Sequence, residues 1–133
     1  MTDFIKIDRL TSRPQFLAAA KGVSEARGAV VVQRLDRGDG DAAIRLGFTA
    51  TRKVGGAVVR NRAKRRLREA ARMLTPLHGR PGSDYVFIAR MGTADRPWDR
   101  LLDDVKSALT RLATPRPAPS DAPLPRAQPG QDR

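Results

Sequence analysis

Residues 52–74 read RKVGGAVVRNRAKRRLREAARML, and this stretch indicates how the chain folds. Gly55-Gly56 separates a short basic pair from the segment 57–74, in which apolar residues recur every three or four positions. At 100° per residue these positions fall within an arc of about 80°. They are Val59, Ala63, Leu67, Ala70 and Leu74. The segment therefore predicts a helix that lies on a sheet by a narrow apolar stripe, with Thr75-Pro76 and residues 78–82 as the signals that end it.

The charge on the same stretch is strongly one-sided. Residues 52–72 contain nine Lys and Arg and one acid, so these 21 residues carry +8 of the chain's net charge of +12. A solvated helix face usually mixes the two signs, and like charges four residues apart repel each other. Guanidinium groups bind phosphate oxygens in pairs and stack on exposed bases. The pattern therefore favours a surface that binds a polyphosphate over a purely structural basic helix.

The composition excludes several classes of protein. A chain of 133 residues with 40% hydrophobic residues suits one domain with one modest core. It has no apolar run long enough to span a bilayer and no basic-then-apolar N-terminal segment. We therefore expect no membrane partner, no secretion signal and a cytoplasmic location. With no cysteine and one histidine, the chain cannot hold a disulfide or a multi-histidine metal site.

The N-terminal half predicts an arm, a helix and a β-hairpin. Residues 1–10 are expected to form an extended arm. Residues 12–21 predict a helix, because a serine and a proline suit its first turn and the glycine that follows suits its end. Residues 29–35 are rich in β-branched side chains, and residues 43–50 alternate apolar and polar side chains. Turn-forming residues 36–41 lie between them, so we predict that the two strands pair as a hairpin.

The C-terminal half predicts a buried strand, an amphipathic helix and a tail. Residues 84–90 form a short, mostly apolar run that is typical of a central strand. Pro97 opens a helix whose apolar residues recur at helical spacing up to Leu112. The last 20 residues, 114–133, hold six of the ten prolines and almost no large apolar side chain, so we expect a disordered tail. The order helix–strand–strand–basic helix–strand–helix predicts one small α+β domain over residues 11–113.

No constellation of side chains in the sequence supports catalysis by the protein itself. His78 has no partner motif and is expected in a surface turn. Asp39 and Asp41 are explained by a polar hairpin turn, and Asp103-Asp104 by a solvent-facing helix surface. Gly55-Gly56 lacks the Gly-Lys-Ser/Thr ending of a nucleotide-binding loop. We therefore predict no catalytic residue and no metal ligand.

Polar and aromatic residues near the basic segment bear on RNA as the ligand. Asn61 lies between Arg60 and Arg62, and its amide offers a donor and an acceptor to a base edge or a 2′-hydroxyl. Aromatic residues make up only 5% of the chain, which argues against a broad base-stacking sheet. Phe16 is the aromatic of interest, either as a base-stacking side chain or as a core residue of its helix.

Residues 52–69 resemble the signature of the bacterial ribonuclease P protein subunit. That signature is a Lys-Lys or Arg-Lys pair, a short glycine-containing loop, and then Arg-Asn-Arg-x-Lys-Arg-x-x-Arg-Glu. The flanks agree, because residues 9–16 resemble the family's N-terminal Arg-Leu and helix phenylalanine. Residues 45–49 and 84–90 resemble two of its strands. The resemblance covers residues 9–112.

The resemblance implies a subunit of a ribonucleoprotein endoribonuclease that matures the 5′ ends of precursor transfer RNAs. In this family the catalytic RNA subunit is required and positions Mg²⁺, and no obligate protein partner is implied. The protein contacts the ribonuclease P RNA through its basic helix and loop, and a cleft between the family's first helix and the sheet holds the 5′ leader. The resemblance also implies a left-handed crossover around the basic helix, where general chirality predicts a right-handed one.

The resemblance assigns two sets of site residues. The RNA-binding set is Arg52, Lys53, Arg60, Asn61, Arg62, Lys64, Arg65 and Arg68. The leader-cleft set is Phe16, Val31 and Gln33. The chain departs from some members at Ala20, where they have a second aromatic, and at Gln33, where they have a tyrosine. We therefore expect leader recognition with less stacking and with hydrogen bonding from Gln33.

Two other classes of protein fit parts of the sequence. Composition alone favours a non-enzymatic basic ribosomal or RNA-chaperone protein, but the ordered Arg-Asn-Arg motif within this order of elements argues against it. A DNA-binding helix protein fits less well, because the sequence has neither a helix-turn-helix pattern nor a heptad dimerisation stretch.

Overall fold

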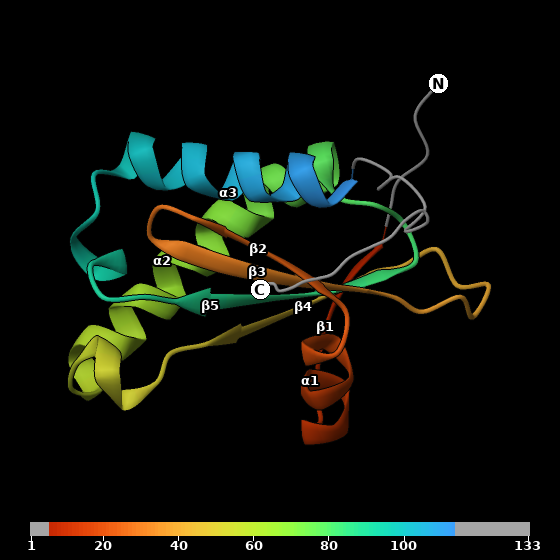
Figure 1. Cartoon of the computed structure of the whole chain (residues 1–133), viewed down its shortest axis with the longest axis horizontal. Helices are drawn as coiled ribbons and strands as arrows, with labels where there is room; N and C mark the ends of the chain where they lie inside the picture. Colours follow the sequence, from red (N-terminus) through yellow and green to blue (C-terminus); the bar gives the residue numbers. More distant parts are fainter. Residues whose placement is uncertain (1–5, 114–133) are drawn as a thin grey trace, which may run out of the picture.

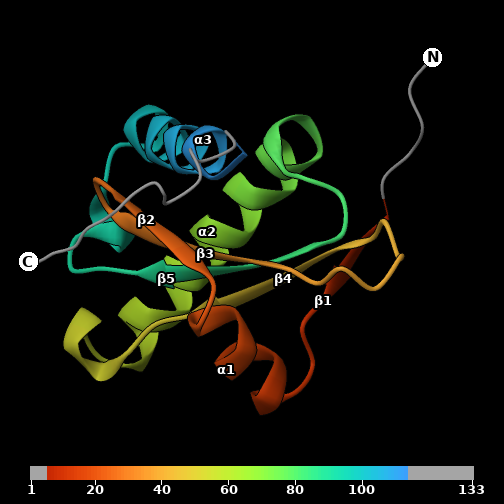
Figure 2. The ribbon, with the colours of Figure 1, turned by 45° about the vertical axis from the view of Figure 1, so that its right-hand side comes forward.

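The structure is a computed structural model that describes residues 6–113, so residues 1–5 and the tail 114–133, predicted to be disordered, lie outside the described part. In chain order the elements are β1 (Ile7–Arg9), α1 (Arg13–Ala20), β2 (Val23–Arg27), β3 (Val30–Asp36), β4 (Ile44–Thr49), the 3₁₀ turn η1 (Arg52–Val54), α2 (Ala57–His78), β5 (Ser83–Ala89), the 3₁₀ turn η2 (Thr93–Asp95) and α3 (Trp98–Ala113). The five-stranded sheet has α2 and α3 on one face and α1 on the other (Figure 1, Figure 2). The predicted α+β class with one small domain is confirmed. No helix within residues 6–113 is long and apolar enough to cross a membrane.

The strand order is β1-β4-β5-β3-β2, with β5 in the centre. β5 runs parallel to β4 and antiparallel to β3, and it is buried along nearly its whole length. A strand buried on both faces needs hydrogen-bonded neighbours on both sides, so β5 inserts between β3 and β4. The predicted hairpin of residues 29–35 with residues 43–50 is therefore wrong, although both segments are strands.

β3 forms its hairpin with β2, an edge strand that the sequence analysis does not predict. The register is antiparallel, with Val23 opposite Arg34 and Arg27 opposite Val30. Gly28 lies between the two strands and has a left-handed φ of 50°. Valine is the only β-branched residue of β2, so the composition of this strand carries no strand signal.

The predicted extended arm over residues 1–10 contributes β1 to the edge of the sheet. β1 pairs with β4 in parallel register, from Ile7 opposite Ile44 to Arg9 opposite Leu46. At the other end of β4, α2 connects this strand to its parallel neighbour β5 and is thus the crossover of the fold. The left hand of this crossover, implied by the resemblance, stays a prediction.

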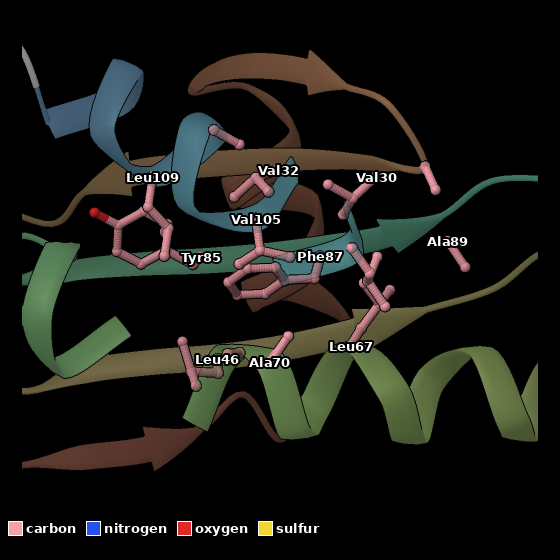
Figure 3. Packing of buried hydrophobic residues seen from close by; sticks show 14 of the residues in the cluster. Val30, Val32, Leu46, Leu67, Ala70, Tyr85, Phe87, Ala89, Val105 and Leu109 are labelled. Carbon is pink, nitrogen blue, oxygen red and sulfur yellow. The ribbon is translucent and has the colours of Figure 1, made fainter. Parts of the chain in front are cut away.

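The main core lies between the sheet and the two helices α2 and α3 (Figure 3). Tyr85 and Phe87 of the central strand are fully buried in it, and Phe87 stacks on Phe48 with ring centroids 5.3 Å apart. Val105 and Leu109 of α3 point onto the same rings. The strand and the amphipathic helix predicted for the C-terminal half are therefore confirmed as the two sides of one core.

α2 packs by the predicted stripe except at Val59, which is exposed, and the helix runs further than predicted. Its buried positions are Ala63, Leu67, Ala70, Ala71 and Thr75. Pro76 lies in the last turn, where its missing N–H removes one helical hydrogen bond while the buried side chain of Thr75 keeps the turn in place. The amide of Gly79 still donates to the Thr75 carbonyl at 2.8 Å. The helix continues through Thr75-Pro76, the first predicted end signal, and ends at the second, residues 78–82. His78 is the last residue of the helix rather than a residue of a surface turn.

Asp103 faces solvent as predicted, but its neighbour Asp104 is buried, which corrects the prediction for that residue. The Asp104 carboxylate accepts hydrogen bonds from the Ala29 amide at 3.0 Å and from Arg96 Nε at 2.9 Å. A Cβ at Gly28 would lie 2.3 Å from this carboxylate, so the turn between β2 and β3 requires glycine. α3 thus holds that turn through a charged side chain, whose contact a helical pattern alone cannot predict.

A buried ion cluster closes the end of the sheet where β5 begins. Asp84 is 1% exposed and accepts hydrogen bonds from Arg37 Nη1 at 2.8 Å and from Arg45 Nε at 2.7 Å. Arg37 also donates to the Asp39 carboxylate and to the backbone carbonyls of residues 41 and 43. The polar loop between β3 and β4 is therefore tied to the central strand.

Replacing Asp84 with asparagine should destabilise the fold by about 3–5 kcal/mol, because it removes the buried negative charge that Arg37 and Arg45 share. The measurement is urea unfolding, in which the midpoint should fall while the m-value stays the same. Asp36→Asn is the matched control, since the Asp36 side chain is 71% exposed and lies 4.0 Å from Arg34. A surface pair of this kind is worth about 0–1 kcal/mol. Equal midpoints for the two variants would contradict the role given to Asp84.

Candidate nucleic-acid interface

The basic stretch folds into the short turn η1 followed directly by α2. Gly55 has a φ of 148°, a conformation that favours glycine, and a Cβ there would lie 2.9 Å from the Val59 side chain. Gly56 is the N-cap of α2 and has open space around it. The two glycines let the chain turn tightly, so Arg52 and Lys53 lie beside the start of α2.

Most of the side chains predicted to bind RNA face solvent. The exposed ones are Arg52, Lys53, Asn61, Arg62, Arg65 and Arg68, and the half-buried ones are Arg60 and Lys64. Among the residues that the structure describes, only Arg62 of this set has a carboxylate within 4.0 Å, and its partner Asp95 is on the surface. Such a pair offsets little of the charge. The outer face of η1 and α2, here called the basic face, therefore carries positive charge that the described protein leaves uncompensated, as a phosphate-binding surface does.

A groove of about 560 Å³ opens beside the basic face. β1 and β4 form its floor, and β1 stops pairing at Arg9, so the edge of β4 beyond Leu46 is open to the groove. One wall is a row of three cations from α2, which are Lys64, Arg68 and Arg72. The apolar part of the lining includes Leu10, Phe16, Leu46 and Phe48. β1 also contributes the charged residues Asp8 and Arg9 to the floor. The apolar part of the floor beside a cationic wall suits a nucleotide chain, whose bases are apolar on their faces and whose phosphates are anionic.

Phe16 lies on the bare backbone of Gly47 in this groove. A Cβ at Gly47 would be 2.5 Å from Phe16 Cε2 and 2.9 Å from Leu10 Cδ1. Phe16 is half-buried and packs with a small cluster on the α1 face of the sheet, which includes Ala19 and Val86. The sequence leaves two roles open for Phe16, a core residue or a ligand contact. One side chain can serve both, because Phe16 packs against this cluster and also lines the groove.

The structure brings Phe16 together with Lys64 and Arg68 rather than with the other two leader-cleft residues. Val31 and Gln33 lie on β3, on the same face of the sheet as Phe16, and both are half-buried. The registers place Gln33 two strands, about 10 Å, from the strand that lies under Phe16. Neither Val31 nor Gln33 lines the groove.

Two residues that shape the groove, Arg72 and Gly47, are not among the predicted site residues. Arg72 extends the row of Lys64 and Arg68, and its spacing of four residues along the helix is the signal that identifies it. Gly47 makes room for Phe16, and a glycine inside a strand is itself a sign that another group approaches closely.

The described residues form no metal centre. Within residues 6–113, no group of three or more His, Asp or Glu side chains could hold a metal ion. The two buried carboxylates, Asp84 and Asp104, both accept hydrogen bonds from arginines. These side chains therefore do not fit a Mg²⁺ site.

A one-domain α+β fold with an uncompensated basic helix beside an apolar groove defines a nucleic-acid-binding protein. The family model described as Ribonuclease P matches residues 4–113 of the chain. The chain is 63% identical over 109 residues to the ribonuclease P protein component of Caulobacter vibrioides (strain NA1000 / CB15N), an alignment that covers 82% of this chain and 73% of that protein. It is 53% identical over 113 residues to the ribonuclease P protein component of Ruegeria pomeroyi, covering 84% of this chain and 90% of that protein.

The fold agrees with the sequence comparison. The chain superposes on the solved structure of the Staphylococcus aureus RNase P protein with a TM-score of 0.66 at 28% identity, covering 78% of this chain and 94% of that one. The chain therefore belongs to the ribonuclease P protein family. The resemblance stated from the motifs is confirmed, and the alternative of a non-enzymatic ribosomal or RNA-chaperone protein is not favoured.

Gly47→Ala should destabilise the protein by about 1–3 kcal/mol, because the added methyl group must displace the ring of Phe16. The measurement is the midpoint of urea unfolding. The same substitution made in a Phe16→Ala background is the control, since most of the penalty should vanish when the ring is absent. A penalty of equal size in both backgrounds would show that Phe16 is not what Gly47 accommodates.

Proposed function

We propose that this chain binds the catalytic RNA of ribonuclease P through the basic face and binds the 5′ leader of precursor tRNA along the groove beside Phe16. The assembled ribonucleoprotein is an endoribonuclease that removes the leader and leaves the mature 5′ end. The observation that carries the proposal is the row of uncompensated cations on α2 next to an apolar groove.

The charge on α2 supplies the affinity for RNA. Side chains four residues apart on a helix are separated by about 6 Å along its axis. Lys64, Arg68 and Arg72 therefore present a regular ladder of positive charge to a phosphate backbone. Each phosphate that is neutralised releases condensed counterions, so binding should weaken steeply as salt rises.

The apolar floor supplies contacts to bases. A base stacked on an aromatic side chain is worth roughly 1–3 kcal/mol, and this contribution tolerates any base. Phe16 is the aromatic on the α1 side of the groove. Val31 and Gln33 lie farther across the same face of the sheet, so we place the continuing leader there, with hydrogen bonds to the amide of Gln33.

We assign the Mg²⁺ and the cleavage chemistry to the RNA, because the described side chains do not fit a metal site. The protein contributes binding and positioning. We expect the complex to act in the cytoplasm on precursor tRNA and to need no further protein subunit.

Reconstitution tests this assignment directly. The protein and the catalytic RNA from the same genome are combined with precursor tRNA and Mg²⁺, and release of the leader is measured. The complex should cleave at the mature 5′ end, and the protein freed of RNA should not cleave. Cleavage by RNA-free protein that a single substitution abolishes would refute the assignment of the chemistry to RNA.

Arg60→Ala and Arg65→Ala should each weaken assembly with the catalytic RNA while leaving the fold intact. One lost charge-assisted contact should reduce the affinity by about 1–3 kcal/mol. Assembly is measured as a dissociation constant at fixed salt, because the constant depends on salt. Arg111→Ala is the control, since this arginine is 64% exposed on α3, outside the basic face. Unchanged assembly in both α2 variants would remove the basic face from the RNA interface.

Phe16→Ala should reduce the preference of the assembled enzyme for precursor over mature tRNA by several-fold or more, the scale of one stacked base. Both dissociation constants are measured at a temperature where the variant is folded, since loss of a half-buried ring also lowers stability. Leu17→Ala is the matched control, because Leu17 lies on the same helix and is 51% exposed. An intact precursor preference in folded Phe16→Ala protein would mean that Phe16 is only a core residue.

A further inference from the structure

Arg66 lies in the middle of the basic run but points toward the protein. It stands at a position that the family signature leaves open. Its Nη1 donates a hydrogen bond to the carbonyl oxygen of Thr93 at 2.6 Å, and its Nη2 donates to the carbonyl oxygen of Arg96. The guanidinium also lies over the ring of Trp98, 5.6 Å from the ring centroid. The two hydrogen bonds are with the segment that joins β5 to α3, and the ring contact is with the first residue of α3.

This segment is itself fixed by the rest of the fold. Thr93 is fully buried, and its hydroxyl donates to the carbonyl oxygen of Ala29 at 2.6 Å. Arg96 donates to the buried carboxylate of Asp104, which also accepts the Ala29 amide. The two carbonyl oxygens that accept hydrogen bonds from Arg66 therefore belong to a segment that is bonded to both the β2–β3 turn and α3.

Among the buried residues of α2, Leu67 is the one large apolar side chain that helps to fix the rotation of the helix about its own axis. Three of its five buried residues, Ala63, Ala70 and Ala71, are alanines, which offer only a methyl group to the neighbouring elements. A roll of about 20° would move a guanidinium at a radius of about 6 Å by roughly 2 Å. Such a displacement breaks a hydrogen bond to a phosphate oxygen. Two charge-assisted hydrogen bonds of fixed direction, as Arg66 makes, oppose this roll.

The surroundings of Arg66 also differ from those of a free surface cation. Burial lowers the pKa of Arg66, and the neighbouring Arg62 guanidinium lowers it further. Arginine nevertheless keeps its charge in proteins. The Arg66 guanidinium thus stays charged although it is partly desolvated and lies beside another cation. Its two carbonyl partners explain this placement better than a general contribution to the basic face does.

We propose that Arg66 is a positioning residue for RNA binding, which fixes the rotation of α2 so that Arg62 and Arg65 face the RNA, and that Arg66 itself makes no phosphate contact. The inference rests on the proposed function, in that α2 is taken to bind the catalytic RNA. On this inference, Arg62 and Arg65 of α2 bind the RNA, and Arg66 orients them.

The test compares Arg66→Met and Arg66→Lys with Arg65→Met, a control of the same shape on the exposed side of the same turn. The dissociation constant for the cognate catalytic RNA is measured across a range of salt concentrations, at a temperature below the unfolding transition of every variant. Arg65→Met should flatten the slope of log affinity against log salt by about 0.7–0.9, the amount that one lost phosphate contact produces. Arg66→Met should weaken binding roughly tenfold or more, the scale of one lost charge-assisted hydrogen bond. It should leave the slope unchanged, because a cation displaced by about 2 Å loses its hydrogen bond but still neutralises its phosphate.

Arg66→Lys separates position from charge. Lysine keeps the charge but cannot reach two carbonyl oxygens with one planar group, so it should not restore the affinity. If Arg66→Met does not fold, the same test is made with Arg66→Lys alone, by measuring its dissociation constant for the RNA and the slope of log affinity against log salt. Trp98, the only tryptophan, reports the contact directly, and its emission should shift in both Arg66 variants of the free protein.

Three results would overturn the inference. A slope that flattens in Arg66→Met as in Arg65→Met would show that Arg66 contacts a phosphate. Unchanged affinity in a folded Arg66 variant would show that its contacts serve stability alone. Full rescue by Arg66→Lys would show that charge suffices. Failure of the proposed function looks different, because Arg65→Met would then also leave RNA affinity unchanged.

Discussion

The structure depends on the burial of a narrow apolar stripe on a helix that is otherwise covered with like charges. Within α2, residues 57–78 contain seven Lys and Arg and a single Glu. Repulsion between neighbours on one helix weakens it, and a helix in water gains most of its stability from packing of its apolar face. α2 persists because Leu67 and three alanines are completely buried against the sheet and α3. The same burial turns the cations outward, so one packing constraint produces both the core and the basic face.

Much of the fold follows from patterns that are local in sequence. The stripe of α2, the apolar run of β5 and the spacing of α3 each repeat with the period of their element, so their type and place could be predicted. The pairing of strands is not local. β3 and β4 are neighbours in sequence, yet β5 enters between them, because a strand buried on both faces competes for the central position. The end of α2 depends on tertiary contacts as well, since the buried Thr75 carries the helix through Pro76.

In the candidate site, too, one part could be predicted from local sequence and another part could not. The basic face could be predicted because an excess of one charge over 21 residues requires a solvent-facing surface whatever the packing. The groove could not, because it depends on where β1 stops pairing and on how Phe16 meets Gly47 across the sheet. The direction of Arg66 also depends on distant residues, since its partners lie 27 and 30 positions later in the chain. Composition counts charges, but only the fold decides which of them are available to a ligand.

Under the proposed function, the uncompensated charge of α2 links the stability of the folded subunit to the amount of its RNA. The helix proposed to bind RNA also contributes to the main core, so a polyanion that neutralises its outer face relieves a repulsion within the folded state. Ligand binding stabilises a native protein by mass action, by about 1.4 kcal/mol for each tenfold rise in ligand above the dissociation constant. The unassembled subunit is thus the less stable form and the first to be unfolded and degraded. The supply of RNA then sets how much of the subunit persists in the folded state.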